Sequence, residues 1–331
     1  MKLKSIASSV VAATALMAGA SSATAAEELT VAYFLEWPMP FQAAKVSGAY
    51  DEALGMKVNW VAFDTGTAMS AAMASGDVQI SVSQGLPPFV VATSAGQDLQ
   101  IVDVAVSYSN NDNCVVRSDL EIDKDSAGDL AGKKVAVPLG TAAHYGFLKQ
   151  MDHFGVALDS MEIVDMAPAE GSVALAQGAI DMACGWGGGL RRMKESGNVL
   201  LTGAEKEALG ILVLDVTTAP AEFIAENSDI VSKFLAVTAD ANAAWNASQP
   251  EFMLNMIAKD AGMSSADAAS SLSTFIFPST EEQLSSKWLG GGVQDFMGGV
   301  AAVFVNAGSI PSANASYAGN VESGPLAATV K

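Results

Sequence analysis

Histidine, cysteine and basic residues are scarce in this chain, and each scarcity narrows the chemistry it can perform. The 331 residues include 2 His and 2 Cys, and 17 Lys plus Arg stand against 36 Asp plus Glu, a formal net charge of -19. An acidic surface repels nucleic acid and anionic lipid, so we expect neither as a partner. His144 and His153 are nine residues apart, on opposite faces of one predicted helix. The sequence therefore predicts no metal site and no cofactor.

Long apolar runs are also lacking beyond the N-terminus, which excludes a later membrane-spanning helix. Lys2 and Lys4 precede an uncharged run over residues 6–20, and small residues follow up to Ala23-Thr24-Ala25. This pattern is typical of a signal peptide, predicted over residues 1–25. No cysteine follows it, so a lipid anchor is not expected. We predict a soluble exported protein of the periplasm, whose net charge falls to -21 once the two lysines are removed.

The two cysteines, Cys114 and Cys184, lie 70 positions apart, a spacing that fits neither a zinc site nor a thioredoxin motif. An oxidising compartment permits a disulfide between them. Both lie in short β-like runs of the same predicted lobe, so pairing is geometrically feasible. Two buried free thiols agree equally well with the sequence.

Between residues 27 and about 218, short β-branched runs alternate with helix-like stretches. This alternation predicts an α/β fold with mainly parallel sheets covered by helices. The predicted strands are Leu29–Tyr33, Lys57–Phe63, Val78–Val82, Leu99–Val106, Cys114–Arg117, Lys134–Val137, Glu162–Val164, Asp181–Trp186 and Ile211–Thr217. The predicted helices are Gly66–Ser75, Pro87–Ala95, Ala142–Phe154, Ser172–Gln177 and Gly189–Glu195. Beyond residue 220 the pattern is mostly helical, with capping-box spacings that begin at Ser264 and Thr280.

Two places in the chain have the character of crossings between lobes. The polar stretch Ser107–Asn113 has neither a helical period nor an apolar run, and the last strand-like run ends near Asp215–Pro220. Two crossings predict a discontinuous first lobe, residues 26–110 plus 219–331, and a compact second lobe, residues 111–218. Two lobes joined by two connections form a hinge around a cleft, the architecture of a closing solute trap.

Ligands in such sheets bind beyond the carboxyl ends of the strands, so the strand-to-helix loops are the candidate site. Free N–H groups at a helix N-terminus favour an anion, although Ser, Thr and Gly there are also ordinary caps. A dinucleotide fingerprint is excluded because Leu190 stands where its third glycine is required. The four candidate loops are Asp64-Thr65-Gly66-Thr67, Ser83-Gln84-Gly85, Pro138-Leu139-Gly140-Thr141 with His144 and Tyr145 following, and Gly185-Trp186-Gly187-Gly188-Gly189.

Glu36, Trp37, Trp186 and Asp215 complete the candidate site. Trp37 follows the first strand and, with Trp186 from the other lobe, is placed to form an aromatic wall against a cation or an alkyl chain. A partly buried packing role is the alternative for each, and it is the commoner role of tryptophan. Asp215 interrupts an apolar strand, where a carboxylate must be paired or must meet a ligand cation. Pairing with Arg117, Arg191 or Arg192 is the competing explanation.

These segments resemble the solute-binding proteins of ABC importers for taurine, sulfonates, nitrate and thiamine precursors. The resemblance covers most of residues 29–220 and is most taurine-like at His144-Tyr145 and Leu214-Asp215-Val216. It implies a type II-like periplasmic binding protein fold, a monomer, an ABC permease partner in the inner membrane and no catalysis. The matching segments are Val61–Gly66, Ala74–Ile80, Gly132–Pro138, Thr141–Tyr145 and Leu214–Val216, with a looser match through Ala179–Asp181 and Trp186.

Carried over by residue, the resemblance implies that Gln84, Gly85 and Thr141, with His144 or Tyr145, hold the anionic group, and that Asp215 receives an ammonium. Taurine or a similar small sulfonate zwitterion is the solute it favours. The loop of Glu36 and Trp37 is more aromatic than expected for a taurine receptor. A betaine or sulfonium compound held by Trp37 and Trp186 is therefore an alternative. An exported hydrolase using His144 is the alternative from another class.

Overall fold

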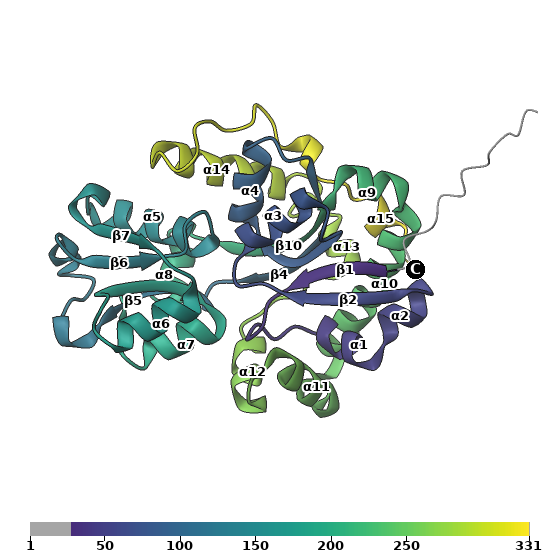
Figure 1. Cartoon of the computed structure of the whole chain (residues 1–331), viewed down its shortest axis with the longest axis horizontal. Coiled ribbons are helices and arrows are strands. Elements are labelled where there is room, and N and C mark those ends of the chain that lie inside the picture. Colours follow the sequence, from purple (N-terminus) through teal and green to yellow (C-terminus); the bar gives the residue numbers. More distant parts are fainter. Residues whose placement is uncertain (1–27, 331) are drawn as a thin grey trace, which may run out of the picture.

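The computed structural model describes residues 28–330, which form two lobes, each built on one five-stranded sheet with helices on its faces (Figure 1). The strand order is β2-β1-β3-β10-β4 in the first sheet and β7-β6-β8-β5-β9 in the second. One strand in each sheet, β10 and β5, runs antiparallel to its neighbours, so each sheet is mixed but mainly parallel. The predicted fold class is confirmed. The predicted signal peptide lies outside the described residues.

Most of the helices and strands lie where the sequence predicts them. The strands are β1 Glu28–Tyr33, β2 Lys57–Ala62, β3 Ile80–Gly85, β4 Leu99–Tyr108, β5 Asp112–Arg117, β6 Lys134–Val137, β7 Glu162–Asp165, β8 Met182–Trp186, β9 Gly197–Val199 and β10 Val213–Pro220. The helices of the second lobe are α5 Ala142–Phe154, α6 Pro168–Ala176, α7 Gly187–Lys194 and α8 Gly203–Ala208. The first lobe holds α1 Phe41–Ser47, α2 Ala49–Leu54, α3 Gly66–Ser75, α4 Leu86–Ser94, α9 Ala221–Glu226, α10 Ser228–Ser248, α11 Glu251–Ala261, α12 Ser265–Leu272, α13 Thr280–Gln283, α14 Gly292–Asn306 and α15 Gly324–Ala327. Short 3-10 turns cover Ser118–Leu120, Ala127–Leu130, Leu158–Ser160 and Ala318–Asn320.

The chain passes between the sheets twice. The first passage is short, because β4 ends at Tyr108 and β5 begins at Asp112. The second passage precedes β10, which pairs with β3 and β4 of the first sheet. Residues 213–218, which the sequence analysis assigned to the second lobe, therefore belong to the first sheet. The reason for the error is that an apolar strand does not reveal which sheet it will join.

Local capping chemistry explains why the helices beside the cleft begin where they do. The side chain of Thr65 accepts a hydrogen bond from Ala68 N–H at the start of α3, and Thr141 does the same for His144 N–H at the start of α5. The predicted cap at Ser264 also forms. The box predicted from Thr280 instead begins one residue earlier, where Ser279 and Glu282 cap each other reciprocally.

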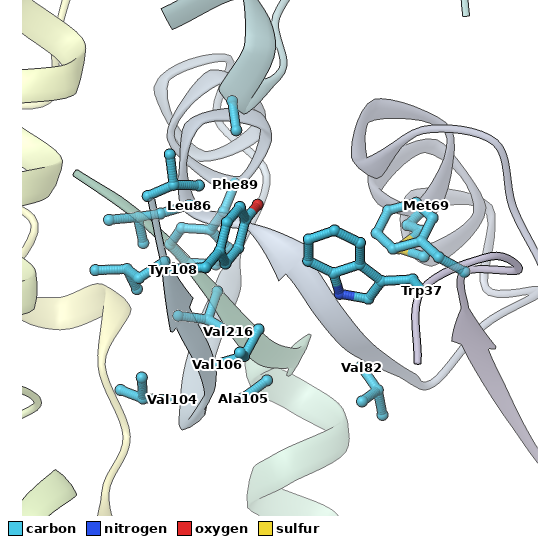
Figure 2. Packing of buried hydrophobic residues seen from close by; sticks show 14 of the residues in the cluster. Trp37, Met69, Val82, Leu86, Phe89, Val104, Ala105, Val106, Tyr108 and Val216 are labelled. Atoms are coloured by element: carbon cyan, nitrogen blue, oxygen red, sulfur yellow. The ribbon is translucent and has the colours of Figure 1, made fainter. Parts of the chain in front are cut away.

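The core of the first lobe supports the ends of three strands that meet at the cleft. Trp37, Val82, Val106, Tyr108 and Val216 are buried together there (Figure 2). Because β3, β4 and β10 pair side by side, this packing fixes the register of Gly85, Val106 and Asp215, which are paired across the sheet. The carboxylate of Asp215 is thus held on a rigid support.

A disulfide links β5 to β8 in the second lobe. Cys114 and Cys184 are directly opposed in this antiparallel pair and form the bond. Of the two arrangements left open by the sequence, the structure therefore has the bridge and not two free thiols. Within residues 28–330, no helix combines the length and the apolarity that a membrane crossing needs.

Candidate ligand-binding site

A small pocket with a cavity volume of about 20 Å³ lies between the two lobes. Seven of its lining residues come from the first lobe and three from the second, so its shape depends on how the lobes close. The lining residues are Phe34, Trp37, Gly66, Gly85, Pro88, Tyr108, Thr141, Ala142, Trp186 and Asp215. In this closed arrangement the cavity has room for about one water molecule, so a solute can enter only when the lobes separate.

Asp215 is the charged residue of this pocket. The hydroxyl of Ser83 donates to its Oδ2 at 2.7 Å, and the hydroxyl of Tyr108 donates to its Oδ1 at 3.1 Å. The side chain is only 3% exposed, and burial raises the pKa of Asp215 to about 8, against the opposing effect of these two hydrogen bonds. A cation placed beside this carboxylate would favour its ionised form.

The structure separates Asp215 from the three arginines proposed as its partners. Arg117 binds Asp119 and Asp181, and it also donates to a backbone carbonyl. Arg191 pairs with Asp267, and Arg192 pairs with Glu36. Within the described part of the chain, Asp215 has hydroxyl donors and no basic partner. Structural pairing with these arginines is therefore not the reason for its burial.

Aromatic residues form the walls near this carboxylate. Trp37 packs edge-on to Tyr108, with ring centroids 4.9 Å apart, and its Nε1–H donates to Ser83 Oγ at 2.9 Å. Phe34 lies edge-on to Trp186 from the other lobe, at 6.0 Å. Trp37 thus packs in the core and also lines the pocket.

Helix N-termini from both lobes supply hydrogen-bond donors at the pocket. Gly66 opens α3 and Ala142 opens α5, and both line the pocket. The N–H groups of the first helical turn have no partner within a helix, and the caps Thr65 and Thr141 take up only one in each case. A Cβ added to Gly140 would lie 3.2 Å from Thr67 Cγ2, so the two N-termini approach each other across the cleft. Free N–H groups at helix N-termini favour an anionic group.

The other two predicted anion-binding loops are less suited to that role. Pro87 and Pro88 occupy the first turn of α4 and remove two backbone donors from it. At the start of α7, a Cβ on Gly188 would stand 2.4 Å from Cδ of Glu36. The protein's own carboxylate therefore already lies at the α7 N-terminus, where the helix dipole favours it.

Five of the predicted site residues line the pocket, and five do not. Trp37, Gly85, Thr141, Trp186 and Asp215 are in the lining. Gln84 is fully buried and bonds to Gly66 O, Ser70 and Thr218 in the core. Thr65 is the α3 cap, and Glu36 is bound to Arg192. His144 and Tyr145 pack against α14, where His144 stacks on Phe304 at 5.3 Å and Tyr145 lies edge-on to Phe296.

The His144 ring is held by a backbone N–H group and by α14. Its Nδ1 accepts a hydrogen bond from Gly140 N–H at 3.1 Å. Burial lowers the pKa of His144 to about 4, so the ring is neutral at pH 7. Within residues 28–330, no group of three or more His, Cys, Asp and Glu side chains is arranged to hold a metal ion.

The lining is completed by residues that the sequence analysis did not select, which are Phe34, Tyr108, Pro88 and Ala142, and by Gly66 from a loop it had named. Tyr108 is the last residue of β4, and Phe34 directly follows β1. The rule that ligands lie at the carboxyl ends of strands could have selected both.

Comparison with known proteins places the chain in a family. The model of the NMT1/THI5-like family matches residues 39–252, well over half of the chain. The chain belongs to the NMT1/THI5-like family. It is 30% identical over 216 residues to the taurine-binding periplasmic protein of Escherichia coli, and 25% identical over 225 residues to a putative aliphatic sulfonates-binding protein of the same organism. Each match covers 65% of this chain and 66% of the relative, just under two thirds of its length.

A solved structure with the same fold is the alkanesulfonate-binding protein SsuA of Xanthomonas axonopodis pv. citri bound to MOPS. It superposes with a TM-score of 0.71, at 19% identity, over 86% of this chain and 95% of its own. At that identity the likeness establishes the periplasmic binding protein fold and no more.

Proposed function

We propose that this protein is the exported receptor of an ABC importer and that it captures taurine or a similar small sulfonate zwitterion between its lobes. The proposal rests on one pocket that has a carboxylate for a cation and helix N-termini for an anion. The buried Asp215 has no basic partner among the described residues and lines the pocket together with Gly66 and Ala142, which open helices in opposite lobes. A zwitterion satisfies both, because its ammonium meets a carboxylate and its anionic group meets free N–H donors.

The family supports the transport role. The two relatives of Escherichia coli are named for binding taurine and aliphatic sulfonates. Export to the periplasm, removal of residues 1–25, a monomeric state and delivery to an inner-membrane permease belong to the same proposal.

The hydrolase alternative loses its main support. His144, its required base, is held by Gly140 and Phe304 and does not line the pocket. A general base must come within hydrogen-bond reach of the proton it removes. We therefore propose a protein that binds its solute and makes or breaks no bond.

A second ligand class is favoured by the walls of the pocket. Four aromatic residues, Phe34, Trp37, Tyr108 and Trp186, line it together with the single carboxylate of Asp215. Aromatic rings with one carboxylate are the usual surroundings of methylated ammonium groups. A betaine or sulfonium zwitterion is therefore the second candidate, bound with its cationic end at Asp215.

Calorimetric titration of the ligand-stripped mature protein tests both candidates. Four compounds separate the contributions of the cationic and the anionic group to binding. They are taurine, ethanesulfonate without the ammonium, β-alanine with a carboxylate in place of the sulfonate, and glycine betaine. We expect taurine to bind with low-micromolar or tighter affinity, roughly -8 kcal/mol or better. Ethanesulfonate should bind far more weakly, because Asp215 then lacks its cation. The isosteric variant Asp215→Asn should weaken taurine binding by roughly 30-fold or more, since one member of a buried charge pair is lost.

The outcomes are distinct. Binding of glycine betaine without binding of taurine would replace the first ligand by the second and keep the site. If ethanesulfonate bound as tightly as taurine, Asp215 would not be the residue that binds the ammonium. No binding of any of the four compounds by folded protein would refute the proposed ligand class.

A further inference from the structure

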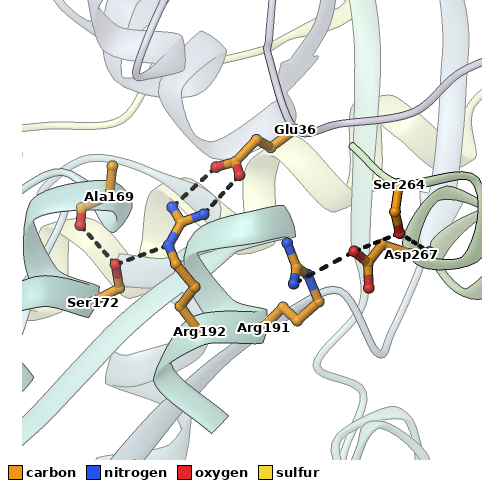
Figure 3. A network of polar contacts seen from close by, with 7 residues as sticks. All are labelled: Glu36, Ala169, Ser172, Arg191, Arg192, Ser264 and Asp267. Atoms are coloured by element: carbon orange, nitrogen blue, oxygen red, sulfur yellow. Dashed lines mark hydrogen bonds and ion pairs between the residues drawn. The ribbon is translucent and has the colours of Figure 1, made fainter. Parts of the chain in front are cut away.

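Two ion pairs join the lobes beside the pocket without lining it. Glu36 follows β1 of the first sheet, and Arg192 lies in α7 of the second lobe (Figure 3). Their contact is bidentate, with Arg192 Nη1 to Glu36 Oε1 at 2.6 Å and Nη2 to Oε2 at 2.9 Å. One residue away, Arg191 Nη1 lies 3.5 Å from Oδ2 of Asp267, in α12 of the first lobe. Both pairs thus connect α7 to the opposite lobe.

Each partner of the bidentate pair is also held by contacts within its own lobe. Arg192 Nε donates to Ser172 Oγ at 3.3 Å, and Ser172 Oγ donates to Ala169 O at 2.7 Å, all within the second lobe. In the first lobe, Glu36 has a positive φ of 52° and its N–H donates to Ala261 O at 2.7 Å. Side chains that are already ordered lose little entropy on pairing.

The N-terminus of α7 is shaped to receive Glu36. Gly187 has a φ of 54°, and a Cβ added there would lie 2.7 Å from Glu36 O. A Cβ on Gly188 would stand 2.6 Å from each carboxylate oxygen. The glycines that resemble a nucleotide fingerprint in the sequence therefore make room for a carboxylate of the opposite lobe.

These contacts exist only while the lobes are together, because each joins residues of different lobes. An interaction made in the closed form alone shifts the equilibrium toward closure and raises the apparent affinity for a ligand that binds that form. We infer that Glu36–Arg192, supported by Arg191–Asp267, is an interlobe latch that sets ligand affinity without touching the ligand. The inference rests on the proposed receptor function, which requires closure around a solute.

A double-mutant cycle tests the latch. Glu36→Gln and Arg192→Gln each keep the size of the side chain and remove the charge pairing. Each should weaken binding of taurine, or of whichever of the four compounds binds, by roughly three- to tenfold, mostly through faster dissociation. The double variant should be little worse than either single variant, because the same interaction is already lost. Gly188→Ala should have the same effect while leaving both charges in place.

The matched control is Lys134→Gln. It breaks the Lys134–Glu162 ion pair, which joins neighbouring strands of one sheet at 3.0 Å and is more exposed than the latch. We expect its affinity to equal that of the wild type. Thermal unfolding of each variant checks that the protein is folded.

Small-angle scattering separates a failed latch from a failed ligand assignment. Without ligand, the Glu36→Gln and Arg192→Gln proteins should show a larger radius of gyration than the wild type, because more molecules are open, and this does not depend on knowing the solute. Unchanged scattering and affinity in folded variants, or fully additive effects in the double variant, would overturn the latch.

Discussion

Ser83 donates its hydroxyl hydrogen to Asp215 while accepting one from the indole of Trp37, so a chain of three side chains from different elements ends on a single carboxylate. Ser83 has a φ of 61°, a left-handed conformation that is uncommon for serine. Such a conformation persists only where the surroundings hold it. The carboxylate is therefore oriented before any ligand arrives, and what it lacks is a positive charge.

The first prediction concerns pH. Burial raises the pKa of Asp215 to about 8, so below pH 8 the free protein holds a proton that an ammonium ligand must displace. Affinity for taurine should therefore rise between pH 6 and 8, by up to about tenfold per pH unit, and level off above pH 8. Binding near pH 7 should release protons, measurable as a dependence of the calorimetric heat on the buffer. Asp215→Asn is the control, and its residual affinity should not depend on pH in this range.

The same carboxyl group affects the stability of the ligand-free protein with the opposite sign. A folded-state pKa above the ordinary value near 4 means that the native state binds more protons than the unfolded state between pH 4 and 8. This contribution to the free energy of unfolding is fully present below pH 4 and is lost as the pH rises to 8.

The affinity measurement decides whether Asp215 binds the ligand. Wild-type protein whose affinity stayed constant from pH 6 to 8 would show that no ligand cation reaches Asp215.

Most of the fold could be predicted because its signals are local. Helices α3 and α5 have the predicted bounds, since threonine caps and apolar periodicity mark their starts and lengths within a few residues. Strand β9 was missed because it has three residues and is stabilised by pairing with β5, far away in sequence. The sheet to which β10 belongs also depends on distant partners, which explains the misplaced boundary.

The candidate site was predicted less completely for a similar reason. Residue type and loop position identified Asp215, Trp186 and Thr141, but they do not say which way a side chain points. Gln84 follows the predicted strand Val78–Val82 as a ligand residue would, yet it lies within β3 and points into the core toward Ser70. Glu36 has the chemistry of a cation ligand, but its partner is an arginine 156 residues away. Only the packing of the two lobes decides between these roles.

The second prediction concerns the disulfide. The bridge closes a loop with a sequence separation of 70 residues in the second lobe. Its removal in Cys114→Ser/Cys184→Ser should lower the free energy of unfolding by about 2–4 kcal/mol, because the unfolded chain regains conformational freedom. Denaturant unfolding with and without reductant measures the difference, and the double variant should not respond to reductant. Two titratable thiols in native protein purified from an oxidising compartment would contradict the bridge.

The third prediction tests whether His144 stabilises the fold or binds the ligand. Its pKa of about 4 lies below the ordinary value of 6.5, so folding favours the neutral ring. The stability it contributes is present above pH 6.5 and is lost as the pH falls toward 4. His144→Asn retains an acceptor for Gly140 N–H but neither stacks on Phe304 nor titrates. We expect it to be less stable than the wild type at pH 7 and to lose less stability on acidification, by up to about 1.4 kcal/mol per pH unit.

Thermal or denaturant unfolding between pH 4 and 7 measures this slope. His153→Asn is the matched control for the substitution itself, because His153 is exposed on the same helix. Ligand affinity at pH 7 should change little in His144→Asn, since the ring does not line the pocket. The contrary outcome is a folded His144→Asn protein that no longer binds the ligand, although small-angle scattering shows the same cleft closure as in the wild type. His144 would then be a ligand-binding residue.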